Sequence, residues 1–303
     1  MDFYSLIRKS IEKHLGLSVQ SISRIGGGAS GSVYRVSCSG KQEEIAVKLS
    51  EHYELTFQEY KMLSFLKQNT ESKIPEVYFF DRIENTAIIA MEYINGVSGM
   101  DKSLKFKANK RHLAESIVDN LLVIQGVHND KFGPYDNAVY DTWQEYYKTL
   151  ANELYDFAKL KYSEKQLDDI VMKAVELSFS NFDEIFCDEV PVPTLIHGDY
   201  QVPNLIIDKT SMELLATIDS FNVMWADPEY ELFALTVAFG KKLHLYEIYK
   251  SKVTVSKYCD VKLEFYALYS ELIWYKRWGI DAPSYMKMRS KKLLRQMKKY
   301  KII

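Results

Sequence analysis

A polar loop between two apolar runs carries the residues best suited to acid–base chemistry and metal binding. It runs from Leu195 to Asp208 and reads LIHGDYQVPNLIID. The apolar flanks predict that the loop lies at the edge of a packed scaffold. Asp199 and Asn204 suit phosphoryl transfer, because a carboxylate accepts the proton of an acceptor hydroxyl and an amide oxygen binds Mg²⁺. His197 is interpreted as a hydrogen-bonding residue that orients this loop.

A further candidate carboxylate, that of Asp219, follows this loop in the sequence. Asp219 comes fifteen residues after Asn204 and directly after Ile218. At the end of a strand, its side chain could hold a metal ion that bridges the β- and γ-phosphates of a nucleotide. Each of these acids taken alone is also a common turn residue, so the prediction depends on their occurring together.

A glycine-rich run lies near the start of the chain. Residues 26–33 read GGGASGSV and fit the pattern G-x-G-x-x-G-x-V, with Gly26, Gly28, Ser30, Gly31 and Val33 as the candidate phosphate-loop residues. Glycines let backbone N–H groups approach phosphate oxygens closely. The run continues into the strand-like SVYRVS, which favours a flap between antiparallel strands over the strand-to-helix turn of dinucleotide-binding proteins. A plain hairpin turn would give the same pattern.

Lys48 is the candidate partner of nucleotide phosphates. It ends the run Ile45-Ala46-Val47-Lys48, fifteen residues after Val33, and resembles the strand lysine of V-A-I-K motifs. A buried ammonium group needs a carboxylate partner. Glu59, on the apolar face of the next expected helix, is the first choice and Glu54 the second. An ordinary surface ion pair is the alternative.

The elements that must position these residues are short at first. Helical spacing of apolar residues predicts a helix over residues 2–15, capped by Asp2 and ended by Gly16. Another helix is expected around residues 55–66. Strands are predicted at residues 32–37, 44–49, 77–80 and 86–93.

Beyond Asn95-Gly96 the pattern becomes mainly helical. Helices are expected over residues 111–128, 141–160, 163–186, 228–250 and 259–299, with one strand-like stretch at 194–219. The sequence therefore predicts an α+β protein with two lobes, residues 1–94 and 95–303, hinged near Asn95-Gly96.

Composition and charge exclude several classes of protein. The 303 residues are 47% hydrophobic and 26% charged, with a net charge of -2, which is ordinary for a globular protein and argues against a nucleic-acid partner. Eight basic residues and no acid lie at 287–303, whereas residues 151–190 hold ten acids and four bases. A basic helix at the end of a chain is most often simply solvated.

The cysteines and the hydropathy pattern indicate the compartment. The three cysteines are far apart and form no CxxC pair, which fits the reducing cytoplasm. The start of the chain lacks the features of a secretory signal, and no apolar run reaches 18 residues, so no membrane association is expected. A monomer is expected.

These motifs together resemble the aminoglycoside phosphotransferase and choline kinase-like superfamily over roughly residues 20–240. The resemblance is carried by the glycine run, Ile45–Lys48, the hinge-like AMEYING at 90–96, HGDxxxxN at 197–204, and Asp219 followed by DPEYEL at 227–232. It implies a bilobal protein-kinase-like fold with a small antiparallel-sheet N-terminal lobe and a mostly helical C-terminal lobe.

The resemblance also implies roles for individual residues. Asp199 would be the catalytic base or orient the acceptor hydroxyl, while Asn204 and Asp219 would bind Mg²⁺. Lys48 and Glu59 would position the phosphates of ATP, with GTP as a possible substitute. The backbone of Glu92 and Ile94 would meet the adenine edge, with Met91 at the back of the pocket.

Two departures concern the acceptor side. Ser220-Phe221 follow Asp219 where the superfamily usually has Trp-Glu, and Ala226 replaces the glycine before Asp227-Pro228. His128, residues 132–135 (FGPY) and Trp143 resemble a stretch found in many of these enzymes. Trp143 is as consistent with a core position as with a substrate-facing one.

The acceptor itself remains open on sequence grounds. An aminoglycoside-type antibiotic, and hence a resistance kinase, is the first choice, because a polycation requires several carboxylates. Asp227, Glu229, Glu231 and the acids of residues 151–190 are candidates, although solvated helix faces would look the same. Trp274, with its aromatic neighbours, could instead form a wall for a macrolide, a sugar or a quaternary amine.

The sequence also allows functions other than an antibiotic kinase. A metabolic kinase for choline, homoserine, a thiosugar or another sugar is the nearest alternative. A fructosamine acceptor is disfavoured because the residues after His197-Gly198-Asp199 lack the Trp-x-Gly-Asn version of the loop. A non-catalytic nucleotide-binding module is the alternative from another class, and the joint presence of Lys48, Asp199, Asn204 and Asp219 argues against it.

Overall fold

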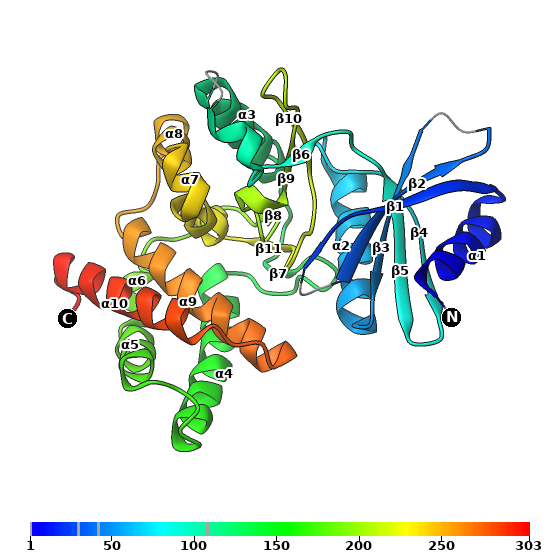
Figure 1. Ribbon diagram of the computed structural model, residues 1–303. Coiled ribbons are helices and arrows are strands. Elements are labelled where there is room, and N and C mark those ends of the chain that lie inside the picture. Colours follow the sequence, from blue (N-terminus) through cyan, green and yellow to red (C-terminus); the bar gives the residue numbers. More distant parts are fainter. Residues whose placement is uncertain (1, 29–30, 41–42, 107–109) are drawn as a thin grey trace. The chain divides into compact units, whose positions relative to one another are not determined.

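The computed structural model describes residues 2–28, 31–40, 43–106 and 110–303 (Figure 1). The α-helices are α1 (Phe3–Leu15), α2 (Tyr53–Asn69), α3 (Lys110–Gln125), α4 (Trp143–Ser163), α5 (Asp169–Ser180), α6 (Phe182–Ile185), α7 (Ala238–Lys242), α8 (Leu245–Lys252), α9 (Cys259–Trp278) and α10 (Pro283–Lys299). The strands are β1 (Val19–Gly28), β2 (Gly31–Cys38), β3 (Ile45–Ser50), β4 (Val77–Ile83), β5 (Thr86–Glu92), β6 (Val97–Ser98), β7 (Gly133–Pro134), β8 (Thr194–Ile196), β9 (Leu205–Ile207), β10 (Leu214–Thr217) and β11 (Met224–Ala226). Three 3₁₀ helices are η1 (Lys102–Phe106), η2 (Val202–Asn204) and η3 (Pro228–Thr236).

The chain forms two compact units, each described by itself. The first unit comprises Met1–Ile124 and Asp199–Phe221, and the second comprises Gln125–Gly198 and Asn222–Ile303. These bounds differ from those of the lobes expected at 1–94 and 95–303, because the first unit takes in most of α3 and the segment that begins at Asp199. The two lobes stay a prediction.

A five-stranded antiparallel sheet is the frame of the first unit. Its strand order is β1-β2-β3-β5-β4 (Figure 1). Successive side chains of a strand point to opposite faces. In β3, Ile45 and Val47 therefore pack into one core cluster, whereas Ala46 joins a different one with Ile89 and Met91.

Helix α1 covers the Ile45–Val47 face of this sheet. Leu6, Ile7 and Ile11 of α1 belong to the same buried cluster as the strand residues. The helix begins as predicted, because the Asp2 side chain accepts a hydrogen bond from the Ser5 backbone N–H at 2.8 Å. It ends at Gly16, whose φ of 66° is the left-handed conformation that glycine adopts without strain.

A buried aspartate fixes α1 against β4. Asp81 is 6% exposed and accepts hydrogen bonds from Ser10 Oγ at 2.7 Å and Lys13 Nζ at 2.8 Å. His14 Nε2 lies 3.2 Å from the same carboxylate. Burial raises the pKa of Asp81, but the hydrogen bonds from Lys13 and Ser10 outweigh it, so that the pKa is lowered overall.

The second unit is built mainly from helices around an aromatic core. Trp143 and Tyr147 of α4 stack with ring centroids 5.0 Å apart, and both contact Tyr266 of α9. A small sheet of order β7-β11-β8 adjoins η3. The basic terminal helix α10 belongs to this core: Arg289 is fully buried and donates to Glu264 of α9 at 2.9 Å.

Most expected elements are confirmed, and the exceptions have local causes. The helix expected at 228–250 is interrupted, because Asp227 and Pro228 begin a 3₁₀ helix and His244 adopts a left-handed φ of 55° between α7 and α8. The helix expected at 259–299 breaks at Gly279, and Pro283 begins α10. Strands β1, β6, β7 and β11 lie outside the predicted strands, because polar residues and glycines obscure the pattern of β1 and the other three have only two or three residues.

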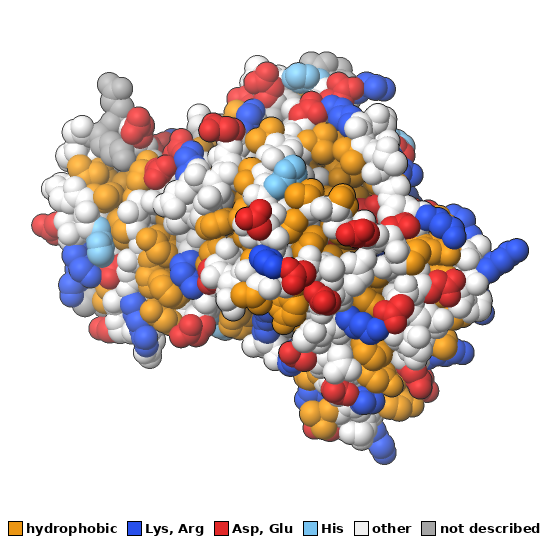
Figure 2. All heavy atoms as spheres, turned by 180° about the vertical axis from the view of Figure 1, so that it is seen from behind, with side chains coloured by type: hydrophobic (Ala, Val, Ile, Leu, Met, Phe, Trp, Pro, Cys, Tyr) orange, Lys and Arg blue, Asp and Glu red, His pale blue; other side chains and the backbone are white. Residues whose placement is uncertain are grey.

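The surface carries charges of both signs. On the face drawn in Figure 2, acidic and basic side chains are interspersed with apolar ones. Within the part of the chain that the structure describes, every helix is too short or too polar to cross a membrane.

The anchoring of α1 can be tested by replacing Asp81. We expect Asp81→Ala to lower the free energy of unfolding by about 2 kcal/mol, because Ser10 and Lys13 lose their shared acceptor. Lys13→Ala, which changes a half-exposed partner, should cost less than about 1 kcal/mol. Because the folded pKa of Asp81 is depressed, its stabilisation exists above the unfolded pKa and is lost as the pH falls through the folded pKa. Urea unfolding at pH 7 and pH 3 measures the stability loss of both variants and its pH dependence. An equal loss from Asp81→Ala at the two pH values would contradict the stabilising role of the ionised Asp81.

Candidate active site

A buried lysine in β3 is the centre of the candidate site. Lys48 is 5% exposed, and its Nζ lies 2.6 Å from Glu59 Oε2 of α2 and 3.0 Å from Asp219 Oδ1. All three residues belong to the first unit. The structure thus brings together Lys48 and its first-choice partner Glu59, whereas Glu54 is exposed in the first turn of α2.

Strand alternation explains how Lys48 reaches these carboxylates. Lys48 pairs with Val33 in β2 and Ile89 in β5, so it lies on the face opposite to α1. Glu59 occupies the apolar stripe of α2, with Met62, Leu63 and Leu66 buried beside it. Burial lowers the pKa of Lys48, but the negative charges of Glu59 and Asp219 outweigh this and raise it, so the ammonium group stays charged. Burial raises the pKa of Glu59 to about 7, although Lys48 opposes this shift.

Asp199 and Asn204 form a second group of contacts. Asn204 Nδ2 donates to Asp199 Oδ2 at 2.7 Å and to the Asp199 carbonyl at 3.0 Å. Gln201 Nε2 also donates to Asp199 Oδ2, at 3.1 Å. Burial raises the pKa of Asp199 to about 7, despite the opposing hydrogen bonds from Gln201 and Asn204. A carboxylate with such a pKa is suited to exchanging a proton near neutral pH.

The Asp199 loop and the segment leading to Asp219 are joined by the backbone. The Ile218 N–H donates to the Asn204 carbonyl at 2.9 Å. Asp219 itself has a φ of 61°, an uncommon conformation for a residue with a side chain. Such strain persists only where the surrounding structure holds it, and it occurs often at functional sites.

The donor atoms around Asn204 and Asp219 fit Mg²⁺. Both side chains offer oxygen, and Mg²⁺ is typically held by one or two such protein ligands together with substrate phosphates and water. The Asn204 amide nitrogen donates to Asp199, so the amide oxygen is the atom that would bind a cation. The Asp219 side chain is 44% exposed, so it remains accessible although one oxygen contacts Lys48.

The described part of the glycine-rich run belongs to two antiparallel strands, β1 and β2. Gly27 pairs with Ser32 and Gly28 with Gly31, so the described glycines lie at the adjoining ends of β1 and β2. A Cβ atom on Gly31 would lie 2.2 Å from the Leu49 carbonyl oxygen, which explains why glycine is required there. Val33 is on β2, while the predicted Ser30 lies outside the described residues.

The segment predicted to meet adenine continues from β5. Met91 is buried in the face that holds Ala46, and Tyr93 follows on the same face. The N–H groups of Glu92 and Tyr93 donate to the carbonyls of Glu76 and Glu44. The predicted contact of adenine with the backbone of Glu92 and Ile94 stays a prediction.

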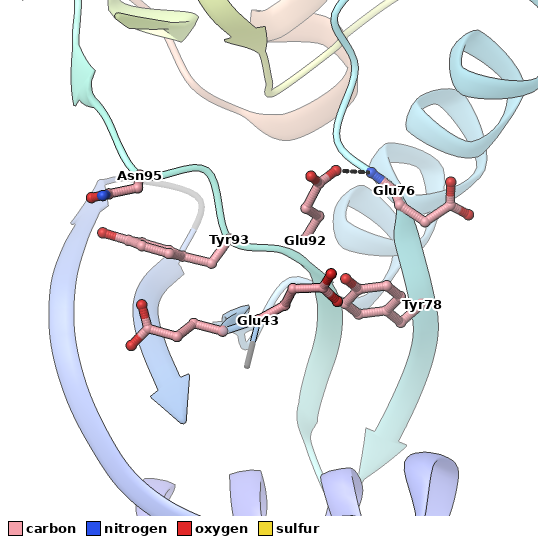
Figure 3. Close-up of a pocket in the computed structure, with 7 residues that line it drawn as sticks. Glu43, Glu76, Tyr78, Glu92, Tyr93 and Asn95 are labelled. Atoms are coloured by element: carbon pink, nitrogen blue, oxygen red, sulfur yellow. Dashed lines mark hydrogen bonds between the residues drawn. The ribbon is translucent and has the colours of Figure 1, made fainter. Parts of the chain in front are cut away.

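A cavity of about 470 Å³ lies at this end of the sheet. Its wall contains four glutamates, two tyrosines and Asn95 (Figure 3). The Glu92 carboxylate accepts from the Glu76 N–H at 3.1 Å, and Arg35 lies over the Tyr93 ring while pairing with Glu44. Lys48, Glu59 and Asp219 are not among the residues that line this cavity. Glu44, which lines it, precedes β3 and lies four positions before Lys48.

The acids expected on the acceptor side are internal to the second unit. Asp227 and Glu229 both contact Lys262 Nζ, at 2.5 and 2.7 Å, and all three are buried. Glu231 accepts hydrogen bonds from the backbone N–H groups of His197 and Gly198, each at 3.0 Å. These three carboxylates are therefore occupied within the fold, which is a poor arrangement for binding a cationic acceptor.

The two tryptophans named for the acceptor side differ in exposure. Trp143 is 1% exposed, and its Nε1 donates to Tyr266 Oη at 2.9 Å, so it is a core residue. Trp274 is partly exposed on α9. His197 is buried, and its backbone N–H donates to Glu231, while the predicted role of its side chain in orienting the loop stays a prediction.

Sequence reasoning did not find every residue of these contacts. Gln201 was overlooked although it stands two positions after Asp199, where a side-chain donor could have been suspected. Lys262 was overlooked too, and a lysine surrounded by apolar residues in a helix, VKLEFYAL at 261–268, is the signal that could have revealed it.

Comparison with known proteins gives one family match along nearly the whole chain. The sequence profile described as fructosamine kinase matches residues 3–299. A comparison with curated protein sequences returned no match. The chain matches this profile although its loop lacks Trp-x-Gly-Asn, so the sequence argument that disfavoured this group was wrong at the level of the family.

Solved structures give the fold. A provisionally named fructosamine-3-kinase from Thermobifida fusca is 16% identical, with a TM-score of 0.69 and coverage of 95% of this chain and 98% of that one. The corresponding protein from Haemophilus somnus is 13% identical, with a TM-score of 0.71 and 96% coverage of both chains. A thermostable mutant of aminoglycoside phosphotransferase APH(4)-Ia, in a ternary complex with AMP-PNP and hygromycin B, is 17% identical, with a TM-score of 0.68 and coverage of 96% and 98%. The chain thus has the α+β protein-kinase-like fold that its motifs predicted.

The Lys48–Glu59 pair can be tested by comparing single and double substitutions. We expect Lys48→Met to lower the free energy of unfolding by about 3–5 kcal/mol at pH 9, because it leaves the Glu59 carboxylate buried without a cation. The loss should be smaller at pH 6, where Glu59 can take up a proton. Lys48→Met/Glu59→Leu, which removes both charges, should recover much of the stability. Urea unfolding of the three proteins measures this, and a double variant as unstable as Lys48→Met at pH 9 would contradict it.

Proposed function

This chain belongs to the fructosamine kinase family, and we propose that it transfers the γ-phosphate of ATP to a hydroxyl group of a sugar linked to an amine. Membership of the family makes it a phosphotransferase that acts on alcohol groups of small molecules. The observation that carries the proposal is the Lys48 cluster: one buried ammonium group held between Glu59 and Asp219 in the first unit, which also contains Asp199 and Asn204.

Each residue of the site has a distinct part in this proposal. Lys48 binds phosphate oxygens as a positive charge, and Glu59 holds its ammonium group in place. Asp199 accepts the proton of the acceptor hydroxyl, and the amide of Asn204 orients its carboxylate. Asn204 and Asp219 would hold Mg²⁺, which neutralises phosphate charge when it is bound. Positioning and charge account for most of the catalysis in such reactions.

ATP is the proposed phosphate donor. One neighbour of the same fold binds AMP-PNP and hygromycin B, and another variant of that protein binds ADP and hygromycin B. Support within this chain comes from the flexible Met91 side chain beside Ala46, which suits a flat purine. GTP stays a possible substitute.

An amine-linked sugar is favoured over a polycationic antibiotic by the charges of the second unit. Asp227, Glu229 and Glu231 are buried and occupied by Lys262, Ser256 and backbone N–H groups. Several acids of residues 151–190 are also paired with lysines, as in Lys148–Asp183 and Lys276–Glu153. An acceptor with several positive charges requires accessible carboxylates, and the three acids predicted on the acceptor side at 227, 229 and 231 are already used within the fold.

The aminoglycoside acceptor predicted from the sequence is the second candidate. It is supported by the hygromycin B complexes of neighbours with the same fold. A role in antibiotic resistance would follow only from that acceptor. We further propose a cytoplasmic location, which the free cysteines Cys38, Cys187 and Cys259 support, and a monomeric state.

The acceptor is identified by measuring ADP release with ATP and Mg²⁺. We expect release to be stimulated by fructose-modified amines, such as fructosyl-lysine, more than tenfold over hygromycin B, choline or homoserine. Asp199→Ala should lower kcat by about 10²–10⁴-fold and leave nucleotide affinity nearly unchanged. Stimulation by hygromycin B alone would replace the proposed acceptor with the second candidate. A folded Asp199→Ala variant of normal turnover would remove Asp199 from its role.

The pKa of Asp199 gives a pH profile. Because its carboxylate must be ionised to accept a proton and its pKa is raised to about 7, kcat/KM should rise with pH through about 7 and be lost below it. Gln201→Leu removes a hydrogen bond that stabilises the ionised form and should move this limb to higher pH. Initial rates between pH 5.5 and 8.5 test both statements. If Gln201→Leu leaves the acidic limb of the pH profile at the same pH, that limb reports the ionisation of a group other than Asp199.

A further inference from the structure

A buried amide in α3 touches three segments that lead to the candidate site. Asn120 is 7% exposed, and its Nδ2 donates to Tyr200 Oη at 3.1 Å and to Thr217 Oγ1 at 3.2 Å. Its Oδ1 accepts from the backbone N–H of Lys73 at 2.9 Å. Both N–H groups and the oxygen of the amide are thus used, and all four residues belong to the first unit.

Two partners of Asn120 are close in sequence to a residue of the site. Tyr200 directly follows Asp199, and Thr217 precedes Asp219 by two positions. Lys73 lies in the segment after α2, the helix that carries Glu59. Asn120 therefore binds residues one and two positions from the proposed base and a proposed magnesium ligand, together with the segment that follows the helix of Glu59.

The partners are also fixed to one another. Tyr200 Oη donates to the Ile117 carbonyl in α3 at 2.8 Å, and the Thr217 N–H donates to the Lys73 carbonyl at 2.7 Å. Tyr200 and Thr217 are 1% and 0% exposed. A hydrogen-bond network that is this buried and satisfied has one preferred arrangement, because any other leaves polar atoms without partners.

We propose that Asn120 is a positioning residue that holds the Asp199 loop and the Thr217–Asp219 segment in their relative places. The inference rests on the proposed function of the site and assigns no contact between Asn120 and the substrates. Asn120 acts through two hydrogen bonds, one to Tyr200 (the Tyr200 arm) and one to Thr217 (the Thr217 arm). The Tyr200 arm determines where Asp199 lies, and the Thr217 arm determines where Asp219 lies.

The two arms predict different kinetic effects, which a general loss of stability would not produce. Tyr200→Phe keeps the ring and removes the hydroxyl, so its main effect should be a lower kcat, with a smaller effect on the Mg²⁺ requirement through Asn204. Thr217→Val keeps the shape and removes the hydroxyl, so it should raise the Mg²⁺ concentration needed for half-maximal ATP binding. Asn120→Ala should show both effects, each about 10-fold or more, as is usual for groups that orient metal ligands and catalytic residues.

The experiment measures ATP binding by equilibrium dialysis across a Mg²⁺ titration, followed by kcat with the acceptor that the ADP-release assay identifies. Ser178→Ala is the control: Ser178 is fully buried in the second unit and bonded to the Val175 carbonyl at 3.2 Å. It should lower thermal stability without changing the Mg²⁺ requirement or kcat.

The outcomes separate this inference from the proposed function. A wild-type protein that binds no ATP with Mg²⁺ would overturn the proposed function and, with it, the role of Asn120. A wild-type protein that binds ATP, beside a folded Asn120→Ala variant with the same Mg²⁺ dependence, would overturn the positioning role alone. An equal change in Ser178→Ala would show that the effect is one of stability and would also overturn it.

Discussion

The burial of one positive charge constrains the first unit more than any other interaction. Lys48 is surrounded by apolar strand residues, and a charge in such a place is tolerated only with close opposite charges. Glu59 must therefore project from α2, and Asp219 must approach from a distant part of the chain. The same requirement that stabilises the lysine also gathers the groups suited to phosphate and magnesium.

The second unit also contains a lysine buried between two carboxylates, but here both carboxylates are buried as well. Lys262 is buried between Asp227 and Glu229, with Tyr266 Oη and Ser256 donating to the same carboxylates. Here one ammonium group and two hydroxyl donors occupy both carboxylates inside the helical core, whereas the Asp219 side chain remains partly exposed. Buried acids that are fully used support a fold, and an accessible acid beside a buried cation can still bind a ligand.

The sequence was informative wherever spacing alone determines proximity. Strand alternation and one helical stripe sufficed to pair Lys48 with Glu59, and the motif indicated that Asp199 and Asn204 act together, as their hydrogen bonds show. Spacing could not show that Lys48 also meets Asp219, which lies 171 positions later. Nor could it distinguish the buried acids 227, 229 and 231 from a solvated helix face, because both have the same pattern. Asn120 carried no signal, since an asparagine in a helix is usually exposed.

The discontinuity of the first unit affects how the protein is made. Residues 1–124 leave the ribosome well before residues 199–221, which complete the same compact unit. At about 5–20 residues per second, roughly 10–30 s pass between the synthesis of Lys48 and that of Asp219. Of the two carboxylates that contact Lys48, only Glu59 has been synthesised during this interval. Asp219 is thus the last of the three residues to be synthesised, and the order of translation lets the Lys48–Glu59 pair form before the site is complete.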